Sequence, residues 1–173
     1  MKILFSYPTK LENEASIINN EMSSGNWDLF HLRKPTWKRT EIETLYKELS
    51  IAVQSKTIIH QSGKQSCHSF EDVEALEGKE EYCFLSPIFD SISKVGYTAA
   101  FDKQELKTFL KKDRKTKVIA LGGLTEENYL EVEEMGFDGG AFLGSIWAKY
   151  SGDFEQNFSG ALGGFKNDLT KLS

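Results

Sequence analysis

The sequence predicts an α/β fold with parallel strands, of the TIM (β/α)8 barrel type. Three observations support this fold class: short apolar runs alternate with helical segments, the connections between them are short, and polar residues or glycines follow most of the runs. Strand-helix-strand units with short connections imply parallel strands with the helices outside the sheet. In a barrel, the carboxyl ends of all strands open on one face, which carries the active site. Because polar residues follow strand after strand, we favour a barrel over an open sheet.

Short runs of apolar, β-branched and aromatic residues predict the strands. They occupy 2–6, 27–33, 57–61, 64–67, 81–86, 117–121 and 136–144. The run KVIAL at 117–121 is typical of a buried parallel strand, because it is apolar and β-branched. The last run, GFDGGAFLG at 136–144, consists mostly of small and apolar residues and predicts the final strand.

Apolar residues at helical spacing and capping residues predict the intervening helices. A first stripe, which Gly25 ends, comprises Leu11, Ala15, Ile18 and Met22. A second, continuous stripe comprises Ile42, Leu45, Tyr46, Leu49 and Val53. Three further helices are predicted from their caps, which are Ser69 with Asp72, Asp102 with Glu105, and Thr125. The tail from Asp153 to Leu172 also predicts a helix.

The composition suits one compact domain over 1–173, because 173 residues with 39% hydrophobic content can bury a sizeable core. The first residues are too short and too polar for a signal peptide, and no run approaches the roughly 20 apolar residues of a membrane span, so we expect a cytoplasmic protein with no membrane partner. A net charge of -5 argues against nucleic-acid binding. Cys67 and Cys83 fit no metal-binding spacing, so we expect reduced thiols.

Two glycine-containing loops predict a phosphate-binding end. LGGLTEEN at 121–128 joins a strand to a helix through two glycines, so backbone N–H groups and a helix amino terminus can face an anion. FLGSIW at 142–147 repeats the arrangement, and the loops after the last two strands of a barrel commonly hold a substrate phosphate. The alternative is that these glycines only relieve crowding in tight turns.

Basic and hydroxyl side chains follow two other strands. Arg33 and Lys34 come at a strand end in HLRKP, where an arginine fork suits a phosphate or diphosphate, although a surface ion pair is the simpler alternative. Lys94 ends the serine-rich stretch FLSPIFDSISK, where its ammonium could meet an anionic leaving group, although it could equally be a solvated lysine.

His68 directly follows a predicted strand and precedes a capped helix. We therefore expect its side chain to face the open end of the strands, where a histidine can move protons near neutral pH. A structural histidine is the alternative. Cys67 has no activating partner in the sequence and is interpreted as packing.

Together these motifs resemble the thiamine phosphate synthase and TenI family, over nearly the whole chain. The matching motifs, in order, are HLRKP, SCHSFEDV, EYCFLSPIFDSISKVGY, VIALGGLTEEN and GFDGGAFLGSIW. The sequences of HLRKP and FLSPIFDSISK are most similar to those of a Bacteroidetes-type branch of thiamine phosphate synthases. The resemblance implies a transferase of thiamine biosynthesis that joins hydroxymethylpyrimidine diphosphate to thiazole phosphate and releases pyrophosphate.

The resemblance also implies roles for individual residues. Arg33, Ser66 and Lys94 would contact the diphosphate, and His68 matches the histidine that TenI-type tautomerases use for proton transfer. The expected catalytic residues are therefore His68, Lys94 and Arg33. The expected substrate-binding residues are His31, Lys34, Ser66, Ser86, Ser91, Ser93, Gly122, Gly123, Leu143, Gly144 and Ser145. Among these, the small hydroxyls would leave room for two substrates, and the glycine loops would hold the thiazole phosphate through N–H groups.

The third predicted strand departs from the family pattern. Family synthases carry Asn-Asp at its end and another aspartate on the fourth strand, and these carboxylates bind the magnesium ion (Mg2+) that the resemblance implies as cofactor. In this chain the third predicted strand has the sequence TIIHQS, and the motif that begins at Lys64 follows almost directly. Either the fourth βα unit has been lost, or a segment is missing between Ser62 and Gly63. The metal ligands are therefore unknown.

Three functions stay open at this point. The leading one is thiamine phosphate synthase, which Arg33 and Lys94 favour. A TenI-like thiazole tautomerase would need the phosphate site and His68 but no metal, and a non-catalytic protein could bind thiazole phosphate or thiamine phosphate. The expected partners are small phosphate-bearing substrates, and an oligomer is compatible with the sequence.

Overall fold

The computed structural model describes residues 1–60, 65–90 and 99–151. The chain divides into two compact units. One, called here the N-terminal unit, comprises Lys2–Gly63 and Trp147–Ser173; the other, called the central unit, comprises Lys64–Ile146 and Met1. The single domain over 1–173 stays a prediction, and the helix predicted in the tail lies outside the described residues.

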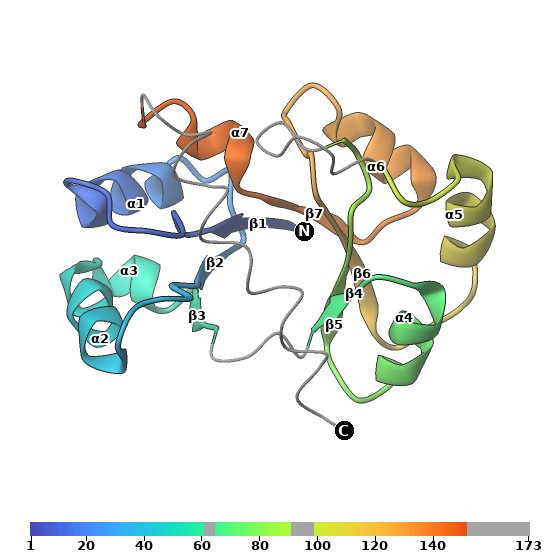
Figure 1. Cartoon of the computed structure of the whole chain (residues 1–173), viewed down its shortest axis with the longest axis horizontal. Helices are drawn as coiled ribbons and strands as arrows, with labels where there is room; N and C mark the ends of the chain where they lie inside the picture. Colours follow the sequence, from blue (N-terminus) through green and yellow to red (C-terminus); the bar gives the residue numbers. More distant parts are fainter. Residues whose placement is uncertain (61–64, 91–98, 152–173) are drawn as a thin grey trace. The chain divides into compact units, whose positions relative to one another are not determined.

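The N-terminal unit contains three parallel strands in the order β3-β2-β1. Its elements are β1 (Lys2–Phe5), α1 (Glu14–Ser23), β2 (Leu29–Leu32), α2 (Arg39–Glu48), α3 (Ile51–Gln54) and β3 (Thr57–Ile59). The register aligns Phe5 with His31 and His31 with Ile58. Helix α1 contacts both α2 and α3, and Figure 1 shows these three helices together on one side of the strands.

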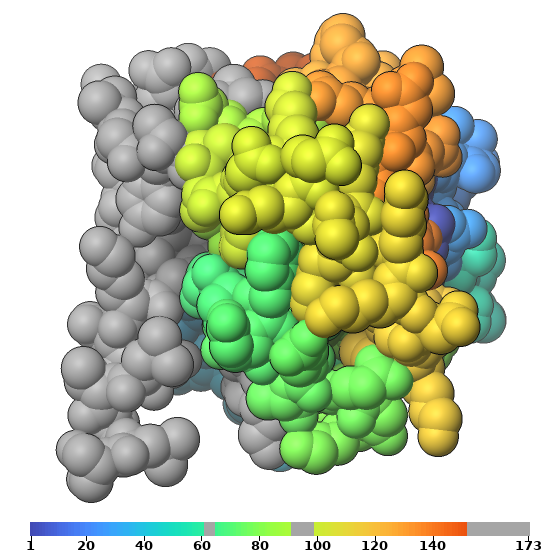
Figure 2. Space-filling view, turned by 90° about the vertical axis from the view of Figure 1, so that its right-hand side faces the viewer, coloured from blue at the N-terminus to red at the C-terminus, as the bar shows by residue number. Residues whose placement is uncertain are grey.

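The central unit contains four parallel strands in the order β4-β5-β6-β7. Its elements are β4 (Ser66–Cys67), α4 (Phe70–Leu76), β5 (Tyr82–Leu85), α5 (Lys103–Leu110), β6 (Lys117–Leu121), α6 (Tyr129–Met135), β7 (Gly139–Phe142) and the first residues of α7 (Gly144–Trp147). Every residue of β5 and β7 is buried, as expected for parallel strands covered by helices. Figure 2 shows the outer surface that α4, α5 and α6 form.

The predicted strands all contain an observed strand, and two predicted helix starts are confirmed. The Ser69 hydroxyl accepts a hydrogen bond from the Asp72 N–H in a complete capping box at α4. The Asp102 carboxylate accepts from the N–H groups of Gln104 and Glu105 at α5. Local side-chain chemistry was sufficient to predict these two starts.

Two helix boundaries differ from the prediction. The continuous stripe from Ile42 to Val53 forms two helices, because Leu49 is extended with φ -74° and ψ 147°, and the Ser50 hydroxyl caps α3. Leu49 is still buried, so the apolar spacing survives the break. Helix α6 begins at Tyr129, four residues beyond Thr125, whose hydroxyl instead accepts a hydrogen bond from the Asn128 N–H in the preceding turn.

The fold is a parallel α/β fold whose strands alternate with helices, as in the repeat of a (β/α) barrel. The described residues contain seven strands. Six residues separate Ile59 from Ser66, and both explanations of the absent fourth βα unit, its loss or a missing segment between Ser62 and Gly63, stay predictions. Within the part of the chain that the structure describes, no helix is long and apolar enough to cross a membrane.

Candidate functional site

The carboxyl ends of the central unit's strands lie along one edge. The register aligns Cys67 with Leu85 and Leu85 with Ala120, and further along the sheet it aligns Leu121 with Ala141. The residues directly after the last residues of β4, β5, β6 and β7 are His68, Ser86, Gly122 and Leu143. Parallel pairing therefore brings together the histidine, the hydroxyl and both glycine loops that the sequence predicted as site residues.

Gly122 and Gly123 have positive φ values of 96° and 67°, a backbone conformation that glycine adopts without strain. A Cβ atom on Gly122 would lie 3.0 Å from the Pro87 Cα, and one on Gly123 would lie 2.3 Å from the Asp90 carbonyl oxygen. The segment after β5 packs this closely because the Phe89 N–H donates to the Gly122 carbonyl at 3.1 Å. Both glycines thus relieve crowding, as the alternative interpretation predicted.

The N–H groups of the same glycine loops lie after strands and at a helix start, where an anion could accept hydrogen bonds from them. Within residues 1–60, 65–90 and 99–151, no backbone acceptor receives a hydrogen bond from the N–H of Gly122, Gly123, Leu143 or Gly144 outside regular helices and strands. The first N–H groups of a helix have no intrahelical acceptor, and α7 begins at Gly144. Relief of crowding and anion binding are therefore compatible in these loops.

Asn128 and Ser145 fix the carbonyl groups of the loop after β6. The Asn128 Nδ2 donates to the Gly123 carbonyl at 2.9 Å, and its Oδ1 accepts from the Thr125 N–H at 2.9 Å. The Ser145 hydroxyl, predicted to bind substrate, donates to the Leu124 carbonyl at 2.8 Å and so links the two loops. Sequence reasoning missed Asn128, although its position three residues after Thr125 is a capping-box spacing.

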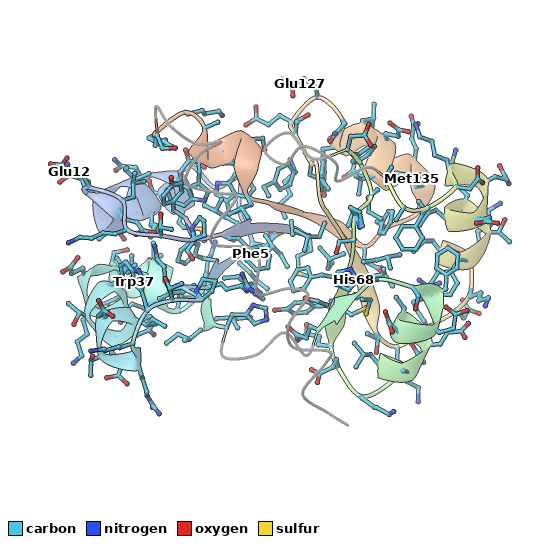
Figure 3. The ribbon with its side chains drawn as sticks, in the orientation of Figure 1. Phe5, Glu12, Trp37, His68, Glu127 and Met135 are labelled. Atoms are coloured by element: carbon cyan, nitrogen blue, oxygen red, sulfur yellow. The ribbon has the colours of Figure 1, made fainter. Side chains whose placement is uncertain are left out.

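His68 lies between β4 and α4 with its side chain exposed (Figure 3). Its N–H donates to the Asp72 carboxylate at 2.8 Å. Its ring Nδ1 lies 3.1 Å from the Ser86 carbonyl oxygen and 3.5 Å from the Ser86 hydroxyl. Ser66 is half-buried in β4, whereas Cys67 and Cys83 are buried free thiols, in agreement with a packing role.

Arg33 follows β2 in the N-terminal unit, and the Ser6 hydroxyl forms hydrogen bonds with both the N–H and the carbonyl group of Arg33. The Arg33 N–H donates to the Ser6 hydroxyl at 2.8 Å, and that hydroxyl donates to the Arg33 carbonyl at 2.8 Å. The positive charge of Arg33 also acts on His60: burial, and then this charge, lower the pKa of His60 to about 4. Arg33 is thus a half-buried cation on a fixed backbone.

Lys34, predicted to be a substrate ligand, forms a buried ion pair. Its Nζ donates to the two Glu14 carboxylate oxygens at 2.5 and 2.6 Å and to the Thr9 carbonyl at 2.6 Å, which occupies all three ammonium protons. Burial raises the pKa of Glu14 to about 7 against the attraction of Lys34, and burial lowers the pKa of Lys34. The predicted alternative, an ion pair, is present but lies in the interior rather than on the surface.

His31, also predicted to bind substrate, is fully buried. Its ring centroid lies 5.0 Å from that of Phe5 and 5.4 Å from that of His60. Burial, and then the neighbouring His60, lower the pKa of His31 to about 3, so both imidazoles are neutral at pH 7. In this conformation His31 is a core residue.

The described residues do not fit a magnesium site. Magnesium prefers oxygen ligands, whereas the side chains at the ends of β2 and β3 are Arg33 and His60. In the described ranges, no group of three histidine, cysteine, aspartate or glutamate side chains could hold a metal ion. Four residues of the predicted site region lie outside those ranges, namely Gln61, Ser91, Ser93 and Lys94.

The alternating parallel strands and helices, with glycine loops after β6 and β7, define a parallel α/β protein with a candidate phosphate site. The structure is similar to that of thiamine phosphate pyrophosphorylase from Bacteroides thetaiotaomicron, with a TM-score of 0.71 and 27% sequence identity over 92% of this chain and 91% of that one. This likeness confirms the resemblance predicted from the sequence.

Two further solved structures share the fold at lower identity. One is described as native KDPGal, with a TM-score of 0.52 and 16% identity over 92% of this chain and 95% of that one. The other is a designed cube-shaped, highly porous protein cage, with a TM-score of 0.51 and 15% identity over 97% of this chain and 75% of that one. No family model and no curated protein sequence matches the chain.

Proposed function

We propose that the chain is a thiamine phosphate synthase, a transferase that joins hydroxymethylpyrimidine diphosphate to thiazole phosphate. The observation that carries this proposal is the similarity to a thiamine phosphate pyrophosphorylase at a TM-score of 0.71 and 27% identity, over 92% of the chain. The glycine loops of the central unit support it, because a substrate phosphate needs a set of convergent donors.

The thiazole phosphate would bind the N–H groups of Gly122, Gly123, Leu143 and Gly144. These groups follow β6 and β7, the place where barrels commonly bind phosphate. Asn128 and Ser145 would support the site indirectly, because they hold the loop carbonyls in place rather than contacting the ligand. Neutral N–H donors suit a substrate that must later leave as product.

The diphosphate of the pyrimidine substrate would contact Arg33, Ser66 and Lys94. As the bond from the pyrimidine methylene to oxygen breaks, its electron pair leaves with pyrophosphate, and the thiazole nitrogen forms the new bond to carbon. Arginine and lysine stabilise the negative charge that develops on the leaving group. Since the described side chains do not fit magnesium, no step is assigned to a metal ion.

His68 would move a proton on thiazole phosphate in the tautomerase alternative, because joining the two halves takes no proton from the thiazole. It is exposed at the carboxyl end of β4, at the same edge as the glycine loops. Histidine is suited to this role because its pKa in water lies near neutral pH. Ser86, Ser91 and Ser93 would line the substrate space as small hydroxyl side chains.

The test is the formation of thiamine phosphate from the two half-substrates, followed by mass spectrometry, with pyrophosphate quantified in parallel. We expect both products in equal amounts and neither product when one half-substrate is omitted. Deuterium exchange into thiazole phosphate without any coupled product would instead identify a tautomerase. Binding of thiazole phosphate with neither reaction would identify a non-catalytic binding protein.

A matched pair of variants separates the two ends of the substrate site. Lys94→Ala should weaken the binding of the pyrimidine diphosphate more than that of thiazole phosphate. Lys111→Ala, which removes an exposed lysine at the end of α5, is the control and should leave both affinities unchanged. The reverse ranking for Lys94→Ala would contradict the assignment of Lys94 to the diphosphate.

A further inference from the structure

One nitrogen of the His68 ring faces a main-chain carbonyl group. The Nδ1 atom lies 3.1 Å from the Ser86 carbonyl oxygen, a normal distance for an N–H to oxygen hydrogen bond. A carbonyl oxygen can only accept, so this contact requires a hydrogen on Nδ1. The Ser86 hydroxyl, at 3.5 Å from the same nitrogen, makes the weaker contact.

The Ser86 carbonyl is held by the backbone of the neighbouring strands. The Ser86 N–H donates to the Cys67 carbonyl at 3.1 Å, which extends the pairing of β4 with β5 by one residue. Two residues further on, the Ile88 N–H donates to the Leu121 carbonyl at 3.0 Å. The acceptor that faces His68 is therefore fixed on both sides by main-chain hydrogen bonds.

The backbone of His68 is fixed as well. Its N–H and that of Ser69 both donate to one carboxylate oxygen of Asp72, at 2.8 and 3.0 Å, within the capping box of α4. The side chain nevertheless remains exposed. A ring that is fixed through its backbone and through Nδ1 can direct its other nitrogen, Nε2, only within a narrow range.

We propose that the Ser86 carbonyl holds neutral His68 in the Nδ1–H tautomer, which leaves the lone pair of Nε2 as the site that exchanges a proton with substrate. Nε2 would take the proton with its lone pair, the imidazolium would keep its bond from Nδ1–H to Ser86, and return of the proton would restore the starting tautomer. Ser86 is then a positioning residue that acts through its main chain. The tautomer is a property of the free protein, while its use in proton transfer rests on the tautomerase alternative named under the proposed function.

Nitrogen NMR of the full chain labelled at its histidines tests the tautomer directly. The chain has 3 histidines, so loss of one set of signals in a His68→Asn variant assigns the His68 resonances. In the neutral form of His68, we expect a protonated Nδ1 and an unprotonated Nε2. A protonated Nε2, or the averaged signals of a freely exchanging imidazole, would overturn the proposal.

A Ser86→Ala variant separates the carbonyl from the hydroxyl, because it removes only the latter. We expect the Nδ1–H tautomer to persist in this variant. A switch to the other tautomer would mean that the hydroxyl sets the protonation state, and the proposal would fail. Neither measurement requires substrate. The NMR experiments therefore test the tautomer, and the product assay separately tests the proposed function.

Discussion

Asn128 uses both ends of its side-chain amide to shape the loop after β6. Its Nδ2 donates to the Gly123 carbonyl and its Oδ1 accepts from the Thr125 N–H, each at 2.9 Å. A peptide group whose carbonyl is held in one direction presents the next N–H in the opposite direction. Asn128 therefore fixes the peptide between Gly123 and Leu124, which directly follows the Gly122 and Gly123 N–H groups assigned to the phosphate.

Asn128→Ala should weaken phosphate binding without preventing folding. Loss of two hydrogen bonds, each with a net contribution of about 1 kcal/mol, should lower the affinity for thiazole phosphate by about tenfold as the loop gains freedom. Isothermal titration calorimetry measures the change. Asn20→Ala in α1 provides the control, since Asn20 is exposed. Equal affinities for the Asn128→Ala and control proteins would show that Asn128 does not position this loop.

The site residues differ in how far the sequence could predict them. His68 was predicted to be exposed after a strand, because the strand before it and the cap after it are local signals. The role of Lys34 could not be predicted in the same way. Its environment depends on Glu14, which lies 20 residues earlier, and the spacing HLRKP carries no information about that partner.

At the scale of elements, the Glu14–Lys34 pair joins the first turn of α1 to the segment after β2. Both side chains are almost completely buried, with exposed fractions of 3% and 0%. An exposed pair, Arg39–Glu43 in α2, joins residues of one helix at 2.8 Å and provides a natural comparison. Removing one partner of a buried pair leaves an uncompensated charge in the interior, whereas an exposed partner regains water.

Glu14→Ala should lower the free energy of unfolding by about 3–5 kcal/mol, because it leaves the Lys34 ammonium buried without its carboxylate. Glu43→Ala should lower it by no more than about 0.5 kcal/mol. The double change Glu14→Leu with Lys34→Met should be less destabilising than Glu14→Ala, since neither charge then remains. Urea unfolding measures the free energy of unfolding of all three variants. Similar decreases for Glu14→Ala and Glu43→Ala would contradict a stabilising role of the buried pair.

Elements were predictable from the sequence where their signals are local. Strand positions followed from short apolar runs, and the starts of α4 and α5 followed from Ser69 and Asp102. The break between α2 and α3 was not predicted, because Leu49 and Val53 keep the helical spacing and are both buried. The spacing of apolar residues predicts which side chains are buried, but it does not predict a change of backbone direction between them.

At the scale of the whole molecule, the parallel α/β class was predictable because the strand-helix alternation recurs along the chain. The pKa values of the histidines could not be predicted from the sequence, because they depend on burial in the tertiary structure. His31 lies in β2 and His60 directly follows the neighbouring strand β3. The structure keeps both imidazoles neutral by lowering their pKa values to about 3 and 4.

The free energy of unfolding should therefore fall as the pH drops below about 6.5, the ordinary histidine pKa in an unfolded chain. Between that value and about 4, the unfolded chain binds protons that buried His31 and His60 exclude, so acid favours unfolding by an amount on the order of a few kcal/mol. The contribution of the two neutral histidines to the free energy of unfolding is fully present above pH 6.5. It is lost as the pH falls toward their pKa values in the folded protein.

Urea unfolding at a series of pH values between 7.5 and 4.5 measures this dependence, and a His60→Gln variant isolates the contribution of one histidine. The variant should show a shallower loss of stability with falling pH than the wild-type chain. Parallel curves for the two proteins would mean that His60 does not resist protonation in the folded state.

In the proposed function, the loops after β6 and β7 bind the phosphate of the thiazole substrate. The most direct measurement is a titration of the labelled full chain with thiazole phosphate, followed in a proton–nitrogen correlation spectrum. The account predicts that the largest shifts occur at the amides of Gly122, Gly123, Leu143 and Gly144, and that inorganic phosphate moves the same signals. Saturable binding that leaves these four amides unperturbed would contradict it.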